Sequence, residues 1–218
     1  FNLKDISGQG ASSVIPVKID TNAAYVQRSG VRLYEASYDD GKYDYGSDDL
    51  TVHVPEVGEP SIVRTALQRQ PETRIHCIRS DGTVAILIFD KTEDVKCWVE
   101  YETDGEVEDI VVLPGTVEDK VIYTVKRTIN GSTVRFHEKW AMESECVGGT
   151  LNKQADSFIS ASGSGATITG LSHLEGESVV CWADGEDKGT FTVSAGAIAQ
   201  SYTTGYVVGL PYTATYKS

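Results

Sequence analysis

Short runs rich in apolar residues, separated by turn residues, recur along this chain, a pattern typical of β-strands. The clearest case is 74–90, where two apolar runs flank Ser80-Asp81-Gly82, a tight-turn sequence that predicts a β-hairpin. In the following run, 95–101, the alternation places Val95, Cys97, Val99 and Tyr101 on one face. Trp98 then faces the other way, and we expect it to pack against a neighbouring sheet. Turn residues delimit the other strands predicted before residue 141, which are 14–20, 24–28, 31–37, 107–113, 120–128 and 133–140.

Helical periodicity is nearly absent from the sequence. The best candidate helix is 61–70, which Pro71 would terminate. Short strands separated by turns every 8 to 15 residues or so are typical of sandwiches and propellers. The sequence therefore predicts an all-β fold of antiparallel meanders, either a partial β-propeller or a sandwich, with a small C-terminal β domain.

The domain organisation follows from a change in composition near Val147. Residues 1–147 form the predicted propeller-like or sandwich domain, and the Gly- and Ser-rich stretch 148–165 is a predicted flexible linker. Residues 166–218 form the predicted small β domain, with strands at 179–183, 189–194, 205–210 and 212–216. Before its first strand, Leu171 and Leu174 are expected to enter the core and Gly176 to permit a tight turn.

The net charge of −13 argues against a basic face that wraps nucleic acid. It fits a soluble surface or the wall of a channel that does not grip passing DNA. The longest apolar stretches fall short of the roughly 18 residues of a membrane span, so no membrane contact is predicted. The four cysteines, Cys77, Cys97, Cys146 and Cys181, form no CxxC pair. Cys77 and Cys181 alternate with apolar neighbours as core thiols do.

Candidate chemistry among the histidines is weak. His53, His76, His137 and His173 lack the short, regular spacing of metal ligands. His76 and Cys77 are adjacent in a strand, so their side chains are expected on opposite faces. A Ser-His-Asp hydrolase would need a nucleophile motif such as GxSxG, and the chain has none.

Carboxylates could serve two further chemistries, calcium binding and glycan cleavage. The run 44–49 (DYGSDD) comes nearest to a calcium loop but lacks its alternating ligands. Glu106, Glu108 and Asp109 cluster as the carboxylates of a glycoside hydrolase could, although exposed strand starts often look the same. Gly163-Ser164-Gly165 lacks the lysine and helix of a phosphate-binding loop. No catalytic, cofactor-binding or metal-ligating residue is therefore predicted, and no cofactor.

Surface residues allow a different kind of function, in which the chain binds a partner. The arginines at 64, 69, 74 and 79 could contact an acidic partner surface. Trp182, or the cluster of Tyr38, Tyr43 and Tyr45, could line a shallow groove for a glycan or a host receptor.

Several short motifs occur in an order that resembles a known family. They are YVQRSGVRL (25–33), DDLT (48–51), QP (70–71), SDG (80–82), Trp98, NG (130–131), HE (137–138), GLSHLEG (170–176), ADG (183–185), Val193, Gly196 and VGLPY (208–212). Over roughly 14–218 the chain resembles the C-terminal part of the tail-hub or nozzle proteins of short-tailed phages, also described as packaged-DNA stabilisation proteins.

The resemblance implies a non-enzymatic, propeller-rich virion protein that is made in the host cytoplasm and assembles with its own copies into a ring. The ring extends the DNA channel below the portal, contacts a portal-proximal adaptor or other tail proteins, retains packaged DNA and later releases it without binding it specifically. Family members are usually longer, so the chain is expected to hold the last part of a larger propeller. Two alternatives remain open: a β-rich module that binds a glycan or host receptor, and a glycan-cleaving tail enzyme.

Overall fold

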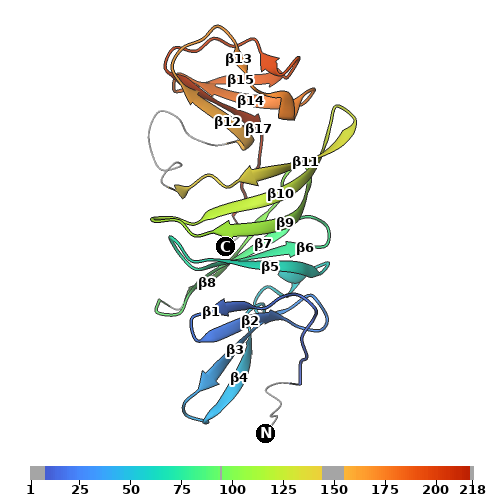
Figure 1. The fold of residues 1–218 in the computed structure, drawn as a ribbon, viewed down its shortest axis with the longest axis vertical. Coiled ribbons are helices and arrows are strands. Elements are labelled where there is room, and N and C mark those ends of the chain that lie inside the picture. The colour runs from blue at the N-terminus through green and yellow to red at the C-terminus, as the bar shows by residue number, and fades with distance from the viewer. Residues whose placement is uncertain (1–7, 94, 144–154, 217–218) are drawn as a thin grey trace. The chain divides into compact units, whose positions relative to one another are not determined.

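The computed structural model describes residues 8–93, 95–143 and 155–216. They form several antiparallel sheets, interrupted by two short 3-10 helices, η1 (Pro55–Gly58) and η2 (Ser172–Leu174) (Figure 1). The all-β prediction is confirmed. No helix among these residues is long and apolar enough to cross a membrane.

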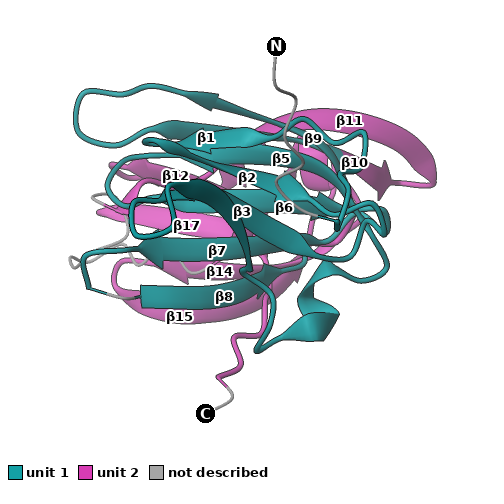
Figure 2. Cartoon of the chain, turned by 90° about the horizontal axis from the view of Figure 1, so that it is seen from below, with its two compact units in different colours: residues 1–102, 106–125 teal, residues 103–105, 126–218 magenta. Residues whose placement is uncertain are grey.

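The chain divides into two compact units (Figure 2). The first comprises residues 1–102 and 106–125, and the second comprises 103–105 and 126–218. The division falls inside one long strand, β10 (Lys120–Ile129).

The first unit begins with two four-stranded meanders, each in sequence order. The strands of the first sheet are β1 (Val17–Ile19), β2 (Asn22–Val26), β3 (Leu33–Asp39) and β4 (Asp44–Asp49). Those of the second sheet are β5 (Ile62–Gln68), β6 (Arg74–Arg79), β7 (Val84–Asp90) and β8 (Val95–Tyr101). The hairpin predicted at 74–90 is present as β6 and β7, with Ile78 opposite Val84 across the turn.

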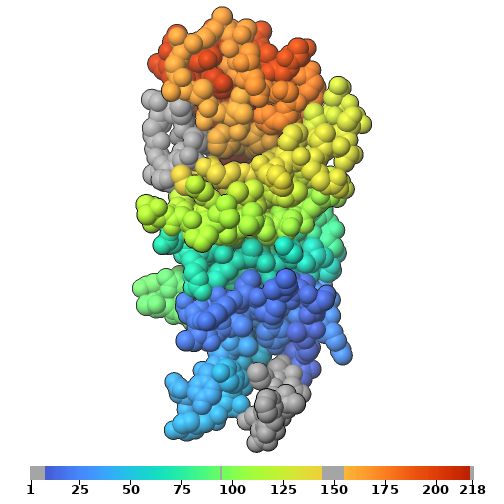
Figure 3. Space-filling model, in the orientation of Figure 1, coloured from blue at the N-terminus to red at the C-terminus, as the bar shows by residue number. Residues whose placement is uncertain are grey.

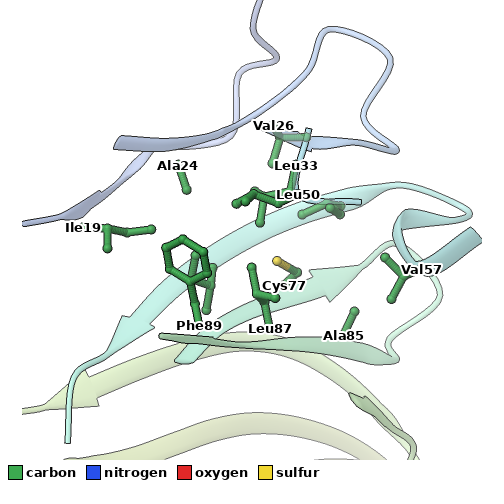
Figure 4. Close-up of a cluster of buried hydrophobic side chains, with 12 residues drawn as sticks. Ile19, Ala24, Val26, Leu33, Leu50, Val57, Cys77, Ala85, Leu87 and Phe89 are labelled. Atoms are coloured by element: carbon green, nitrogen blue, oxygen red, sulfur yellow. The ribbon is translucent and has the colours of Figure 1, made fainter. Parts of the chain in front are cut away.

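A single apolar cluster joins these two sheets. Ala24, Val26 and Leu33 from the first sheet meet Leu87 and Phe89 from β7, and all are nearly inaccessible to water (Figure 4). Trp98 packs against this cluster, as predicted, and its indole nitrogen donates to the Leu50 carbonyl at 3.0 Å. Because alternate residues of each strand point into the cluster, it fixes the register of both sheets.

The third sheet has the order β11-β10-β9, with β9 (Glu106–Leu113) and β11 (Ser132–Lys139) on either side of β10. Within the first unit, the opening strands of successive sheets lie next to one another: β1 is beside β5, and β5 is beside β9. The second sheet therefore contacts the first sheet through β1 and the third sheet through β9.

The second unit contains a further four-stranded sheet of order β12-β17-β14-β15. Its strands are β12 (Asp156–Ser162), β14 (Ser178–Ala183), β15 (Glu186–Thr192) and β17 (Gly205–Leu210), and a two-stranded sheet joins β13 (Ile168–Thr169) to β16 (Ala197–Ile198). Leu171 and Leu174 are fully buried in its core, and Gly176 adopts a φ of 83°, as the sequence predicts.

Three sequence predictions need correction. The helix predicted at 61–70 is wrong, because Ile62–Gln68 forms β5 and pairs with β6. The β-branched residues Ile62, Val63 and Thr65 favour a strand once a partner supplies the backbone hydrogen bonds.

The second correction concerns the predicted linker at 148–165, which contains strand β12; its beginning, up to residue 154, lies outside the described residues. The third concerns the strand predicted at 212–216, where the chain forms none. Pro211 has no N–H to donate, and Tyr212 and Tyr216 are exposed, so neither pairing nor packing holds this segment to a sheet.

Gly58, at the end of η1, is buried where the backbone of Val31 passes close by. A Cβ at this position would lie 2.1 Å from the Val31 carbonyl oxygen. Gly58→Ala is therefore expected to lower the free energy of unfolding by about 1–3 kcal/mol, which urea denaturation measures. Gly46→Ala is the matched control, because a Cβ at Gly46 meets nothing within 4 Å. Equal midpoints for the two variants would contradict this packing.

Candidate functional site

A group of polar side chains in the interior of the first unit surrounds His76 on β6. Its side chain is completely buried, with Nδ1 2.7 Å from the Tyr123 hydroxyl and Nε2 3.2 Å from Gln68 Oε1. Gln68 Nε2 in turn donates to the Gln70 carbonyl at 2.8 Å. Cys77, its neighbour in the strand, lies in the apolar cluster on the opposite face, as predicted.

These bonds determine the tautomer of His76. Gln68 Oε1 can only accept, so His76 Nε2 carries the proton and donates it. Nδ1 then accepts from the Tyr123 hydroxyl. Burial, assisted by the positive charge of Arg74, lowers the pKa of His76 to about 3. At neutral pH the ring is uncharged and both nitrogens are engaged, so His76 has a structural role.

A second buried polar group, the carboxylate of Asp119, holds together the loop that precedes β10. Asp119 accepts backbone amides from Arg69 at 2.7 Å, Gln70 at 3.1 Å and Gly115 at 3.2 Å. Burial alone would raise the pKa of this carboxyl, but the three amides together hold it below its ordinary value. This carboxylate thereby holds the loop in place through three backbone amides.

In the second unit, the guanidinium of Arg127 on β10 is almost completely buried. Its Nε and Nη2 each lie 2.7 Å from an oxygen of Glu138 on β11, which is a bidentate ion pair. Nη2 also donates to Thr103 Oγ1 at 2.8 Å and lies 3.7 Å from Asp156 Oδ2, and Nη1 donates to the Asp104 carbonyl. Arg127 thereby ties β12, through Asp156, to the β10–β11 hairpin.

The other three histidines lie elsewhere along the chain. His53 and His137 are exposed, and His173 contacts the Ser157 carbonyl through Nε2 at 3.0 Å. In the part of the chain that the structure describes, no group of three or more His, Cys, Asp or Glu side chains is arranged to hold a metal ion. Cys77 and Cys181 are buried and free, Cys97 is exposed, and Cys146 lies outside the described residues.

The carboxylates considered for glycan cleavage lie at an exposed strand. Glu106 and Glu108 on β9 are exposed, and Asp109 forms an ion pair with Arg64 at 2.9 Å. The other three arginines considered for a partner surface also pair with carboxylates of the first unit: Arg69 with Asp20, Arg74 with Glu72, and Arg79 with Glu100. Their charges are thus largely neutralised within the chain.

Aspartates at turns accept backbone amides in both units. The run 44–49 forms strand β4, with Asp49 accepting the Thr51 amide at 2.7 Å. Asp184, at the β14–β15 turn, accepts the amides of Thr204 at 2.7 Å and Thr203 at 2.9 Å. These amides hold the pKa of Asp184 far below its ordinary value. These carboxylates hold the backbone in place by accepting its amides.

The aromatic candidates divide into two environments. Trp182 on β14 is half-buried, and in the described residues its buried Nε1 has no hydrogen-bond partner. The tyrosine cluster instead lies at the surface, on the β3–β4 hairpin, where Tyr38 and Tyr45 are cross-strand partners. Tyr38, Tyr43 and Tyr45 are 47%, 83% and 51% exposed, so this hairpin carries the most accessible aromatic surface among the predicted candidates.

Sequence reasoning missed Arg127, although a signal was present. In β10 the buried positions alternate as Val121, Tyr123 and Val125, and Arg127 continues the same phase. A charged residue in the buried phase of a strand indicates an internal ion pair. The chain matches no protein-family model, and no curated protein shows significant sequence similarity to it.

Proposed function

We propose that the chain is a non-enzymatic structural protein of a phage tail, part of a ring that extends the DNA channel below the portal. The observation that carries the proposal is the succession of β-meanders that begins in the first unit. Their opening strands, β1, β5 and β9, lie next to one another in this order. Propeller blades are four-stranded meanders, as the first two of these sheets are, whereas the third sheet has three strands. This agrees with the propeller expected from the ordered motifs of the sequence.

The polar interior supports a structural role. His76, Asp119 and Arg127 are the kinds of residue that perform chemistry in enzymes, and here each is engaged by internal partners. The acidic surface is the second support. A net charge of −13 repels phosphate groups, so DNA would pass a channel wall of this charge without being held.

Self-assembly of the chain is the consequence of this proposal that is easiest to measure. Static light scattering coupled to size exclusion, at increasing protein concentration, is expected to give masses at multiples of the 23.6 kDa chain. Negative-stain electron microscopy of the largest species should show closed rings. A single 23.6 kDa species at every concentration would contradict ring assembly by this chain.

A further inference from the structure

The outermost strand of the second sheet, β8, has an open edge. It follows β7 at the end of the order β5-β6-β7-β8, and no further strand pairs with it in the described part of the chain (Figure 2). Its pairing with β7 runs without a bulge from Val95 opposite Asp90 to Tyr101 opposite Val84. The end of β7 and the start of β8, light green in Figure 3, project from the rest of the first unit. A long and regular edge strand of this kind is a template for a strand of another chain.

One hydrogen bond shows which backbone groups of β8 lie at this edge. The Phe89 amide of β7 donates to the Thr73 carbonyl at 3.0 Å, on the side of β6. Successive residues of an antiparallel strand direct their N–H and C=O groups to opposite sides. Ile88 therefore bonds toward β8, where Cys97 is its partner. The backbone groups of Cys97 are thus occupied by β7, and those of its two neighbours point to the open edge.

The open edge of β8 consists of the N–H and C=O groups of Lys96, Trp98 and Glu100. Among the described residues, no backbone hydrogen bond reaches any of these groups. The Trp98 carbonyl has only a weak contact, with the Cys97 thiol at 4.0 Å. These donors and acceptors are therefore available to a strand of another chain.

We propose that two copies of the chain pair through β8, antiparallel to each other, about a two-fold axis at Trp98. In this register Trp98 of one copy lies opposite Trp98 of the other, and Lys96 lies opposite Glu100. Residues whose backbone groups point outward then meet only residues of the same kind, as an antiparallel ladder requires. This contact goes beyond the ring proposed above, because a two-fold contact closes at two copies and a ring needs a separate contact.

The charges along the edge point to a second copy as the occupant. Lys96 is exposed, and the described residues hold no ion-pair partner for it. The Glu100 side chain is 55% exposed and binds Arg79 through Oε1 at 2.6 Å, which leaves Oε2 for a second cation. Pairing about Trp98 brings Lys96 and Glu100 of different copies opposite each other twice. Opposite charges placed directly across a strand pair stabilise it.

The apolar side chains on the other face of β8 also match. Val95 and Val99 are 38% and 44% exposed, and Cys97 between them is exposed. In the proposed register Cys97 lies opposite Val99 of the second copy, and Val95 lies opposite Tyr101. The pairing therefore covers apolar surface that a single copy leaves in water.

Other edge strands of the chain are less suited to pairing with themselves. The sequence of β4, DYGSDD, is rich in aspartate, so two copies side by side would bring like charges together. The pairings of β12 and β15 with their neighbours contain shifts in register. Charges and bulges of these kinds protect sheet edges. β8 is regular, and its two charged residues are of opposite sign.

Disulfide cross-linking of the whole chain tests the register. In a Cys146→Ser background, Val99→Cys places a thiol opposite Cys97 of the second copy. Residues that face each other in this way have Cα atoms about 4.5 Å apart, which a disulfide can bridge. Oxidation by copper phenanthroline is expected to give a covalent dimer, with a disulfide between positions 97 and 99 found by mass spectrometry. With Cys97 alone, or with Cys97→Ser added to Val99→Cys, the nearest thiols are diagonal and about 7–8 Å apart, so the yield should fall about tenfold.

The charge match is tested by Lys96→Glu, which places like charges opposite each other. It is expected to raise the dissociation constant of the dimer, measured by static light scattering, about tenfold. The matched control is Lys120→Glu, which makes the same change in charge on an exposed side chain of β10 and should change the constant less than about twofold.

Three results would overturn the pairing: a chain that stays monomeric at every concentration, equal cross-linking with and without Cys97, or equal dissociation constants for Lys96→Glu and Lys120→Glu. Rings that form without the disulfide between positions 97 and 99 would also overturn it and leave the ring proposal standing. Cross-linked dimers that never grow larger would support the pairing and contradict the ring.

Discussion

Replacing Arg127 by methionine is expected to lower the free energy of unfolding of the second unit by about 3–5 kcal/mol. The guanidinium is only 1% exposed and forms the bidentate pair with Glu138, whose side chain is 20% exposed. Methionine fills a similar volume but leaves the carboxylates of Glu138 and Asp156 without their cation. Urea denaturation followed by circular dichroism measures the loss, and hydrogen–deuterium exchange locates it in β10, β11 and β12.

Two further variants separate buried charge from lost packing. Arg127→Met combined with Glu138→Gln also removes the Glu138 charge, which Arg127→Met alone leaves without its cation. The double variant is expected to recover part of the lost free energy of unfolding. Arg64→Met removes an ion pair whose two side chains are about half exposed, and it should cost less than about 1 kcal/mol. A cost for Arg127→Met as small as that for Arg64→Met would contradict the role assigned to the buried pair.

As the pH falls from about 6.5 to about 3, the free energy of unfolding is expected to decrease because of His76. The folded protein holds this ring neutral, with a pKa of about 3, whereas the unfolded chain binds a proton at an ordinary histidine pKa near 6.5. Within this window the unfolded state therefore carries more protons, so acidification favours it by up to about 1.4 kcal/mol per pH unit. Above the window both states are neutral at this position, and the contribution is constant.

The measurement is a series of urea denaturations between pH 7 and 4.5. The carboxyls with lowered pKa, such as Asp119, lose their stabilising contribution only as the pH falls below about 4, so they stay outside this range. His76→Gln keeps a polar side chain and should reduce the dependence on pH, even if its absolute stability is lower. His53→Gln, on an exposed side chain, should keep the wild-type slope. If the free energy of unfolding of His76→Gln depends on pH as steeply as that of the wild type, His76 is not the source of the dependence.

Local patterns allowed much of the fold to be predicted. The hairpin at 74–90 was predictable because its two apolar runs and its turn lie within a few residues of each other. The strand at 62–68 was missed because its identity depends on pairing with β6, which competes with the local helical pattern. The segment 212–216 has the composition of a strand, but a strand also needs a partner, and composition carries no information about that.

The polar networks were harder to predict, since their members are distant in sequence. His76 and Tyr123 are 47 residues apart, and Asp119 is 50 residues from the Arg69 amide that it accepts. Alternation places Tyr123 in the buried phase of β10, and β6 is buried on both faces, but only the stacking of sheets brings His76 and Tyr123 together. The tyrosine cluster of the β3–β4 hairpin, by contrast, is local to one hairpin, so its aromatic residues could be grouped from the sequence.

Immunogold labelling of purified phage particles, with antibodies raised against this chain, tests the proposed tail role most directly. The particles should come from the host culture that carries the gene, and mass spectrometry of the same preparation should accompany the labelling. We predict label at the tail end of the particles and recovery of the chain as a stoichiometric particle protein. Particles free of label and free of peptides from the chain would contradict the account.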